Sequence, residues 1–86
     1  MEIQYTKHAE AILAERGITK DVVEELLSHP QQVIKGKGKE EIVQGVFERC
    51  GERFLLRVLY VKTSGTHKII TAYWTSKIDK YWEGKR

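Results

Sequence analysis

Hydrophobic residues recur at helical spacing near the start of the chain. Ala9 and Ile12 belong to a face that repeats every three or four residues, which predicts an amphipathic helix from Lys7 to Arg16. Thr6 stands where a helix N-cap is expected, and Gly17 stands where a left-handed residue commonly ends a helix. The sequence therefore predicts both ends of this helix.

The same spacing returns a few residues later. A second helix is predicted to start at Thr19 and to stop before Pro30, because the residue ahead of a proline disfavours helical backbone. We expect the two helices to form a hairpin with one apolar side. The apolar positions of the second helix are Val22, Val23, Leu26 and Leu27.

Strand-like runs follow Pro30, separated by turns that contain glycine. The segment from Glu2 to Tyr5 also alternates and could form a short edge strand. These patterns predict an α+β domain in which the two N-terminal helices pack on a twisted antiparallel sheet of about four strands. The four runs are Gln32 to Lys35, Ile42 to Arg49, Phe54 to Lys62 and His67 to Thr75.

A short C-terminal helix is the last element that the pattern predicts. Ser76 and Asp79 have the spacing of a capping box, and Gly84 marks the expected end. The apolar face of this helix would consist of Ile78, Tyr81 and Trp82.

The run from Phe54 to Val61 is apolar on both faces, so it is predicted to be a central strand with helices on one side and a partly open surface on the other. Arg57 is the exception on the face that it shares with Leu55 and Leu59. An unpaired buried guanidinium is costly, so we expect either a salt bridge to a carboxylate such as Glu48 or a bound anion. The sequence leaves both alternatives open.

Charge is distributed unevenly along the chain, whose formal net charge is +3. Residues 62–86 contain five Lys and one Arg against two carboxylates, whereas the first 31 residues contain six carboxylates against three cations. One face should therefore attract polyanions. The C-terminal lysines could neutralise RNA phosphates while the aromatic rings stack on bases, or the lysines could be simply solvated and the rings buried. The RNA-binding candidates are Lys68, Lys80, Tyr81 and Trp82.

Length and composition narrow the classes of protein to which this chain can belong. A chain of 86 residues is expected to form a single domain, residues 1–86. Its single cysteine, Cys50, cannot form an internal disulfide, which favours a cytoplasmic location. The scattered histidines form no recognisable ligand set, so we expect no metal or other cofactor. No apolar run reaches the roughly 20 residues that span a bilayer, and no membrane association is expected.

Several short segments together carry a resemblance to a known family. They are Tyr5 to Ala9, Glu15 to Ile18, Val22 or Val23, Leu26 or Leu27, Pro30, Arg57 to Tyr60, Ile69 to Tyr73 and Thr75 to Tyr81. These segments resemble a small bacterial and archaeal family that is described only as a domain of unknown function and is grouped near the RelE/ParE-type toxins. The resemblance implies a RelE-like α+β fold. It also implies the toxin of a type II toxin–antitoxin system, an mRNA endoribonuclease that needs no metal. Its partners would be a cognate antitoxin and mRNA, at times on the ribosome.

Under that resemblance, Arg57 and Lys77 are the catalytic candidates for holding the phosphate oxygens. Tyr73 or Tyr81 is the candidate for proton donation or stacking, and His8 or His67 is the candidate for proton transfer. His8 could equally be a packing or capping residue at the start of its helix. ParE-type relatives use the same scaffold to inhibit a protein, DNA gyrase. The alternative is therefore a non-catalytic binding module of the same fold.

Overall fold

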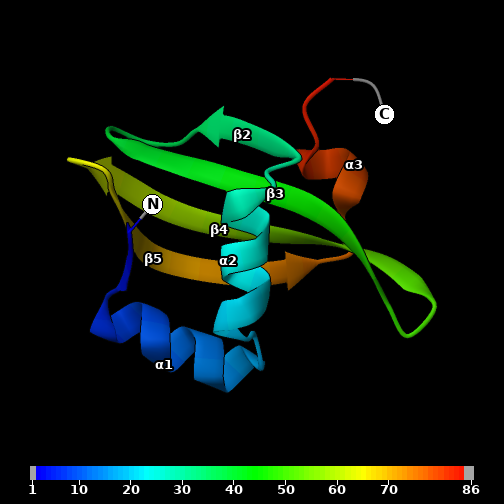
Figure 1. The fold of residues 1–86 in the computed structure, drawn as a ribbon. Helices are drawn as coiled ribbons and strands as arrows, with labels where there is room; N and C mark the ends of the chain where they lie inside the picture. The colour runs from blue at the N-terminus through cyan, green and yellow to red at the C-terminus, as the bar shows by residue number, and fades with distance from the viewer. Residues whose placement is uncertain (1, 85–86) are drawn as a thin grey trace.

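The sheet is mixed and has five strands in the order β1-β5-β4-β3-β2 (Figure 1). The structure, a computed structural model, describes residues 2–84. The predicted α+β class is confirmed, whereas the purely antiparallel sheet of about four strands is wrong. The strands are β1 (Glu2–Tyr5), β2 (Gln32–Lys35), β3 (Glu40–Arg49), β4 (Glu52–Thr63) and β5 (Thr66–Thr75), and the helices are α1 (Lys7–Arg16), α2 (Lys20–Ser28) and α3 (Ile78–Tyr81).

The strand β1 accounts for the mixed character of the sheet. It pairs in parallel with β5, in a register that runs from Glu2 opposite Thr66 to Tyr5 opposite Ile69, while every other pair is antiparallel. The chain leaves β1 at one edge of the sheet, passes through α1 and α2, and begins β2 at the opposite edge. Alternation in sequence indicates that a segment is a strand but not which strand it pairs with.

Local capping explains where the first two helices begin and end. The Thr6 side chain accepts a hydrogen bond from the Ala9 N–H at 2.9 Å, and Gly17 ends α1 with a φ of 66°. The Thr19 side chain caps α2 by accepting from the Val22 N–H at 3.3 Å. The predicted caps at Thr6 and Gly17 are thus confirmed, as is the predicted start of the second helix at Thr19.

The predicted helical hairpin is wrong. The helix α1 contacts β5 and β1, whereas α2 crosses over β3 in a different direction (Figure 1). Ile18 helps to fix the change of direction between them, because its side chain is buried and its N–H donates to the Leu13 carbonyl at 2.9 Å. Gly45 lets α2 approach the sheet, since a Cβ atom there would lie 2.7 Å from Leu26 Cδ1.

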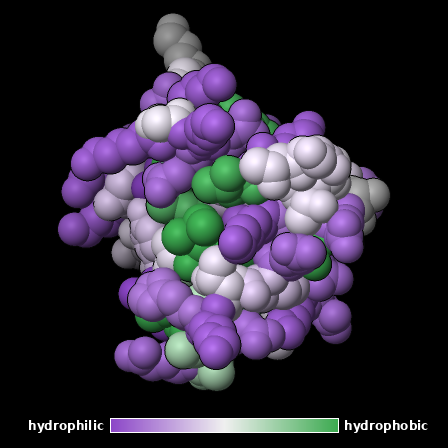
Figure 2. Space-filling model, turned by 90° about the vertical axis from the view of Figure 1, so that its left-hand side faces the viewer, coloured by the Kyte–Doolittle hydropathy of each residue, from purple (hydrophilic) through white to green (hydrophobic). Residues whose placement is uncertain are grey.

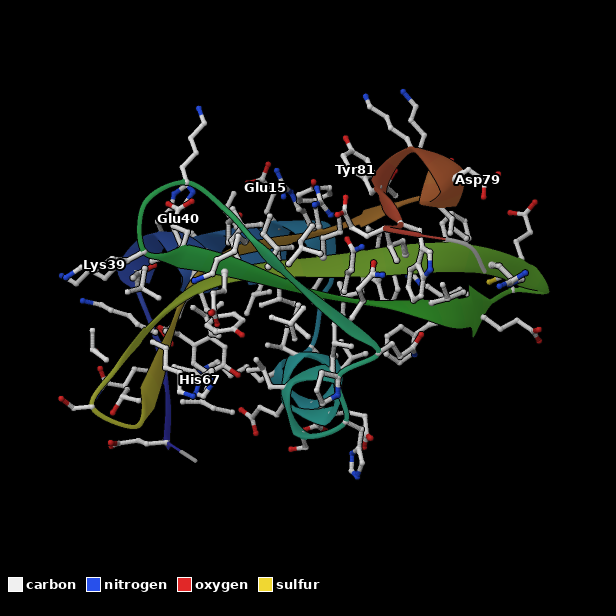
Figure 3. All side chains as sticks on the ribbon, turned by 90° about the horizontal axis from the view of Figure 1, so that it is seen from above. Glu15, Lys39, Glu40, His67, Asp79 and Tyr81 are labelled. Atoms are coloured by element: carbon white, nitrogen blue, oxygen red, sulfur yellow. The ribbon has the colours of Figure 1, made fainter. Side chains whose placement is uncertain are left out.

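The main hydrophobic core lies between the sheet and α1 and α2. Leu56 and Val58 of β4 belong to it, whereas the alternate residues Leu55 and Arg57 point to the opposite face. This division of the central strand is as predicted. The helix α3 lies on that opposite face, so the sheet separates it from α2 (Figure 3).

Candidate functional site

Arg57 occupies the middle of the sheet and is 7% exposed. The strand register places Gln44 of β3 on one side of it and Tyr73 of β5 on the other. Its Nε atom donates a hydrogen bond to Gln44 Oε1 at 2.9 Å, and Nη1 donates to the Tyr73 hydroxyl. Three neighbouring strands thus bring these three side chains into one row.

Two aromatic rings flank the guanidinium group. The Tyr81 ring centroid lies 4.1 Å from Arg57 Cζ, and the Tyr73 centroid lies 5.7 Å from it. The two rings meet edge to face, with centroids 6.4 Å apart. Cation–π contacts of this kind are strengthened where water is excluded. We call the four residues Arg57, Gln44, Tyr73 and Tyr81 the Arg57 cluster.

Side-chain amides connect the Arg57 cluster to the C-terminal segment. Gln44 is fully buried, and its Nε2 donates to Gln32 Oε1 at 2.6 Å and to the Tyr81 carbonyl at 3.0 Å. Gln32 in turn exchanges two hydrogen bonds with the backbone of Glu83, at 2.7 and 3.0 Å. All polar atoms of the Gln44 amide are therefore used within the protein.

Arg57 has no carboxylate within ion-pair distance among residues 2–84. The expected alternative of a salt bridge to Glu48 does not form, because the neutral oxygens of Gln44 and Tyr73 take its place. A guanidinium has five N–H donors, and the hydrogen bonds within the described part of the chain use two of them. The other three donors have no hydrogen-bond partner among those residues.

The other C-terminal candidates lie on or near the same face. Lys77 precedes α3, its N–H donates to Thr75 Oγ1 at 3.0 Å, and its side chain is exposed. Lys80 Nζ lies 5.3 Å from the Tyr81 ring centroid, and Trp82 is half-buried at the end of α3. Lys68 is exposed near the start of β5, where it pairs with Val61, so it lies further from Arg57 along the strand.

Neither candidate histidine contacts the Arg57 cluster. His8 is exposed in the first turn of α1, in the helical layer. His67 points to the same layer, where its ring lies 4.9 Å from that of Tyr60, on the other side of the sheet from Tyr81 (Figure 3). Burial, followed by the charge of Lys62, lowers the pKa of His67 below its usual value. The sheet thus brings Arg57 and Tyr73 together but not His8.

Sequence reasoning missed Gln44 and Gln32. One signal was present: Gln44 is an amide in the middle of a strand-like run, flanked by Val43 and Gly45. Its importance depends on cross-strand pairing with Arg57, and sequence patterns do not specify that register.

Three other properties of the described residues bear on the kind of site. No cavity is detected in the described part of the chain. Within residues 2–84, no group of three or more His, Cys, Asp or Glu side chains is placed to hold a metal ion. None of the described helices is long and apolar enough to cross a membrane.

The fold and the Arg57 cluster define a small α+β domain in which the arginine at the centre of the sheet forms no ion pair with a carboxylate of residues 2–84. A family model described as a domain of unknown function (DUF4258) matches residues 5–74, and the chain belongs to that family. The matched segment includes Gln44, Arg57 and Tyr73 but ends before α3. The match provides no link to RelE or ParE. No curated protein and no solved structure matches the chain.

Proposed function

We propose that this protein binds single-stranded RNA through the Arg57 cluster, and that it is a RelE-type toxin that cleaves mRNA without a metal. One observation supports the proposal above all: the Arg57 guanidinium is buried, has only neutral partners among the described residues, and keeps unused N–H donors. A phosphate oxygen would accept charge-assisted hydrogen bonds from those donors. A base could stack on the neighbouring Tyr73 or Tyr81 ring.

In the proposed reaction the RNA 2′-hydroxyl attacks the adjacent phosphorus. The P–O2′ bond forms as the P–O5′ bond breaks, which leaves a 2′,3′-cyclic phosphate and a 5′-hydroxyl. Arg57 and Lys77 bind the phosphate oxygens as negative charge grows, and the Tyr73 hydroxyl donates its proton to the departing 5′-oxygen. The 2′-hydroxyl proton leaves to solvent, because His8 lies in the helical layer, away from this cluster.

A non-catalytic binding module is the second candidate. Arg57 stacks under Tyr81 and is hydrogen-bonded to β3 and β5, an arrangement that also suits a structural arginine. In this case the domain would inhibit a protein target or serve in a complex, as ParE-type relatives do.

The toxin proposal includes a cognate antitoxin. On the open sheet face, half-buried apolar side chains lie in register across β2, β3 and β4 beside the Arg57 cluster. Figure 2 shows a small hydrophobic area surrounded by hydrophilic side chains at one end of the molecule. An acidic amphipathic helix or strand would complement an apolar strip near a basic C-terminal region. The strip comprises Ile34, Ile42 and Leu59, which lie in register, and Val61, the next residue of β4 on the same face.

Binding of a labelled single-stranded RNA, measured by fluorescence anisotropy, tests the first step. Arg57→Gln should abolish binding, and Lys77→Ala should weaken it and reduce the slope of log affinity against log salt by about one. Lys37→Ala is the matched control, since Lys37 lies in a loop away from the cluster. Equal affinity of wild type and Arg57→Gln would rule out this site.

Cleavage is tested separately by growth arrest and primer extension on cellular mRNA. RNA binding without cleavage would favour the second candidate. Co-expression with neighbouring small genes, followed by affinity purification, tests the antitoxin: recovery of the chain alone, with no growth defect when it is expressed unaccompanied, would contradict the toxin assignment.

A further inference from the structure

The segment Lys77–Gly84, which we call the C-terminal strap, lies across the Arg57 cluster. Its backbone is bound by side-chain amides: Gln44 donates to the Tyr81 carbonyl at 3.0 Å, and Gln32 pairs with both polar backbone groups of Glu83. The Tyr81 ring covers the guanidinium of Arg57. The strap therefore occupies the space above the cation that an anion would approach.

Several features indicate that the strap is weakly attached to the rest of the domain. Its helix, α3, spans four residues, and its N-cap residue Lys77 makes no side-chain capping bond. A single helical turn has little stability of its own. Ile78 is its one buried hydrophobic residue among those described, and it lies outside the core cluster between the sheet and the other two helices.

Detaching the strap would leave the main core intact. It is joined to the sheet at Thr75, and its contacts with the sheet include the amide hydrogen bonds, the buried Ile78 and the stacked Tyr81. Local openings of this kind require less free energy than global unfolding. Opening would uncover the guanidinium of Arg57, the hydroxyl of Tyr73 and the amide of Gln44 together.

We propose that the C-terminal strap is a displaceable cover that closes the anion site, and that phosphate binding at Arg57 and docking of the strap exclude each other. The inference rests on the proposed function in naming RNA phosphate as the ligand. A ligand that binds only the open form shifts the population toward it, and loosening the strap must tighten that ligand by the same coupling. The strap thus sets the fraction of molecules that can bind.

Gln32 offers a way to loosen the strap without touching Arg57. The substitution Gln32→Ala removes both hydrogen bonds to Glu83 and the acceptor for Gln44. Gln31→Ala is a matched control, because the Gln31 amide makes the same kind of paired contact, at 2.9 and 3.3 Å, with the backbone of Val46 instead of the strap. Both variants lose one amide beside β3.

The position of the strap can be followed through Trp82, which is half-buried at the end of α3. Incorporation of 5-fluorotryptophan gives separate ¹⁹F resonances for Trp74 and Trp82, assigned with Trp82→Phe. We expect inorganic phosphate to shift the Trp82 resonance toward its solvent-exposed position in wild type but not in Arg57→Gln. Gln32→Ala should show this shift without phosphate and should bind single-stranded RNA about three- to tenfold more tightly, whereas Gln31→Ala should do neither.

The outcomes separate the cover from the RNA proposal. If Gln32→Ala exposes Trp82 but leaves RNA affinity unchanged or weaker, the cover is wrong, although RNA binding at Arg57 can still stand. If no variant binds RNA, but phosphate still exposes Trp82 through Arg57, the RNA proposal fails and the cover stands for another phosphate ligand. If phosphate leaves Trp82 unchanged in wild type and in Gln32→Ala, the cover is overturned.

Discussion

The centroid of the Tyr81 ring lies 4.1 Å from Cζ of Arg57, so a ring from the C-terminal helix covers a cation from the central strand. Such a contact, largely shielded from water, is worth on the order of 2 kcal/mol. It accounts for part of the stabilisation that a carboxylate would otherwise provide. The N–H donors of Arg57 that have no partner among the described residues make it a candidate anion site.

Replacing Arg57 is the most direct test of the catalytic role. If it stabilises the phosphorane, Arg57→Ala should slow mRNA cleavage by about a hundredfold or more. Tyr73→Phe should also slow cleavage, because it removes the hydroxyl that donates to the leaving oxygen. Primer extension on cellular mRNA measures both, with circular dichroism to establish folding. Equal toxicity and identical cleavage patterns in wild type, Arg57→Ala and Tyr73→Phe would remove this site from consideration.

Gln44 is predicted to be important for stability as well as for positioning Arg57. The substitution Gln44→Leu leaves the Nε of Arg57 and the Tyr81 carbonyl without their partner, which should lower the free energy of unfolding by about 2 kcal/mol or more. Urea denaturation measures this loss. Gln4→Leu is the control, since Gln4 is exposed in β1 and its substitution should change stability little. A similar loss in both variants would contradict the role of the buried amide.

Much of the fold was predictable because it depends on local patterns. The cap at Thr6, the start of the second helix at Thr19 and the two faces of β4 follow from residue type and spacing alone. The pairing of β1 with β5 and the crossing of α2 over β3 depend on contacts between distant segments. The predicted capping box at Ser76 also did not form, because α3 begins one residue later, after Lys77.

The close approach of α2 to the sheet makes Gly45 sensitive to substitution. Gly45→Ala should destabilise the protein by about 1–3 kcal/mol, because the new methyl group would meet Leu26 Cδ1 at 2.7 Å and force the helix to shift. Thermal or urea unfolding measures the change. In a double-mutant cycle with Leu26→Ala, the two effects should fail to add, since the clash disappears with the leucine side chain. Strict additivity would show that the contact is not the cause.

Stability should also depend on the protonation of His67. Burial lowers its pKa in the folded state below the usual 6.5, with Lys62 acting in the same direction and Glu41 opposing it. The unfolded chain therefore binds the proton more readily, so the stabilising contribution is complete above about pH 6.5 and is lost as the pH falls through the lowered value.

The measurement is urea denaturation at a series of pH values. His67→Phe keeps a ring beside Tyr60 and should weaken the pH dependence on the acidic side, whereas His8→Gln, at an exposed position, should not. Superimposable pH profiles for wild type and His67→Phe would refute the assignment.

The candidate site was predictable only in part. Arg57 was identified because it is a cation on an apolar strand face, and Tyr73 because of its place in the last strand. Arg57 pairs with Gln44 and not with the expected Glu48, because the β3–β4 register places Gln44 directly opposite Arg57. Glu48 instead lies opposite Arg53, nearer the turn. Residue type indicated an unsatisfied charge, but only the register decided what satisfies it.

The parallel pairing of β1 with β5 also affects the order of folding. The strands β3, β4 and β5 are joined by short turns and can assemble from neighbouring segments, whereas β1 must find a partner at the other end of the matched domain. Contacts between residues so far apart in sequence are slow to form, because a long loop must close first. During synthesis on the ribosome, α1 and β1 must therefore wait for β5 to emerge, and the N-terminal segment docks among the last.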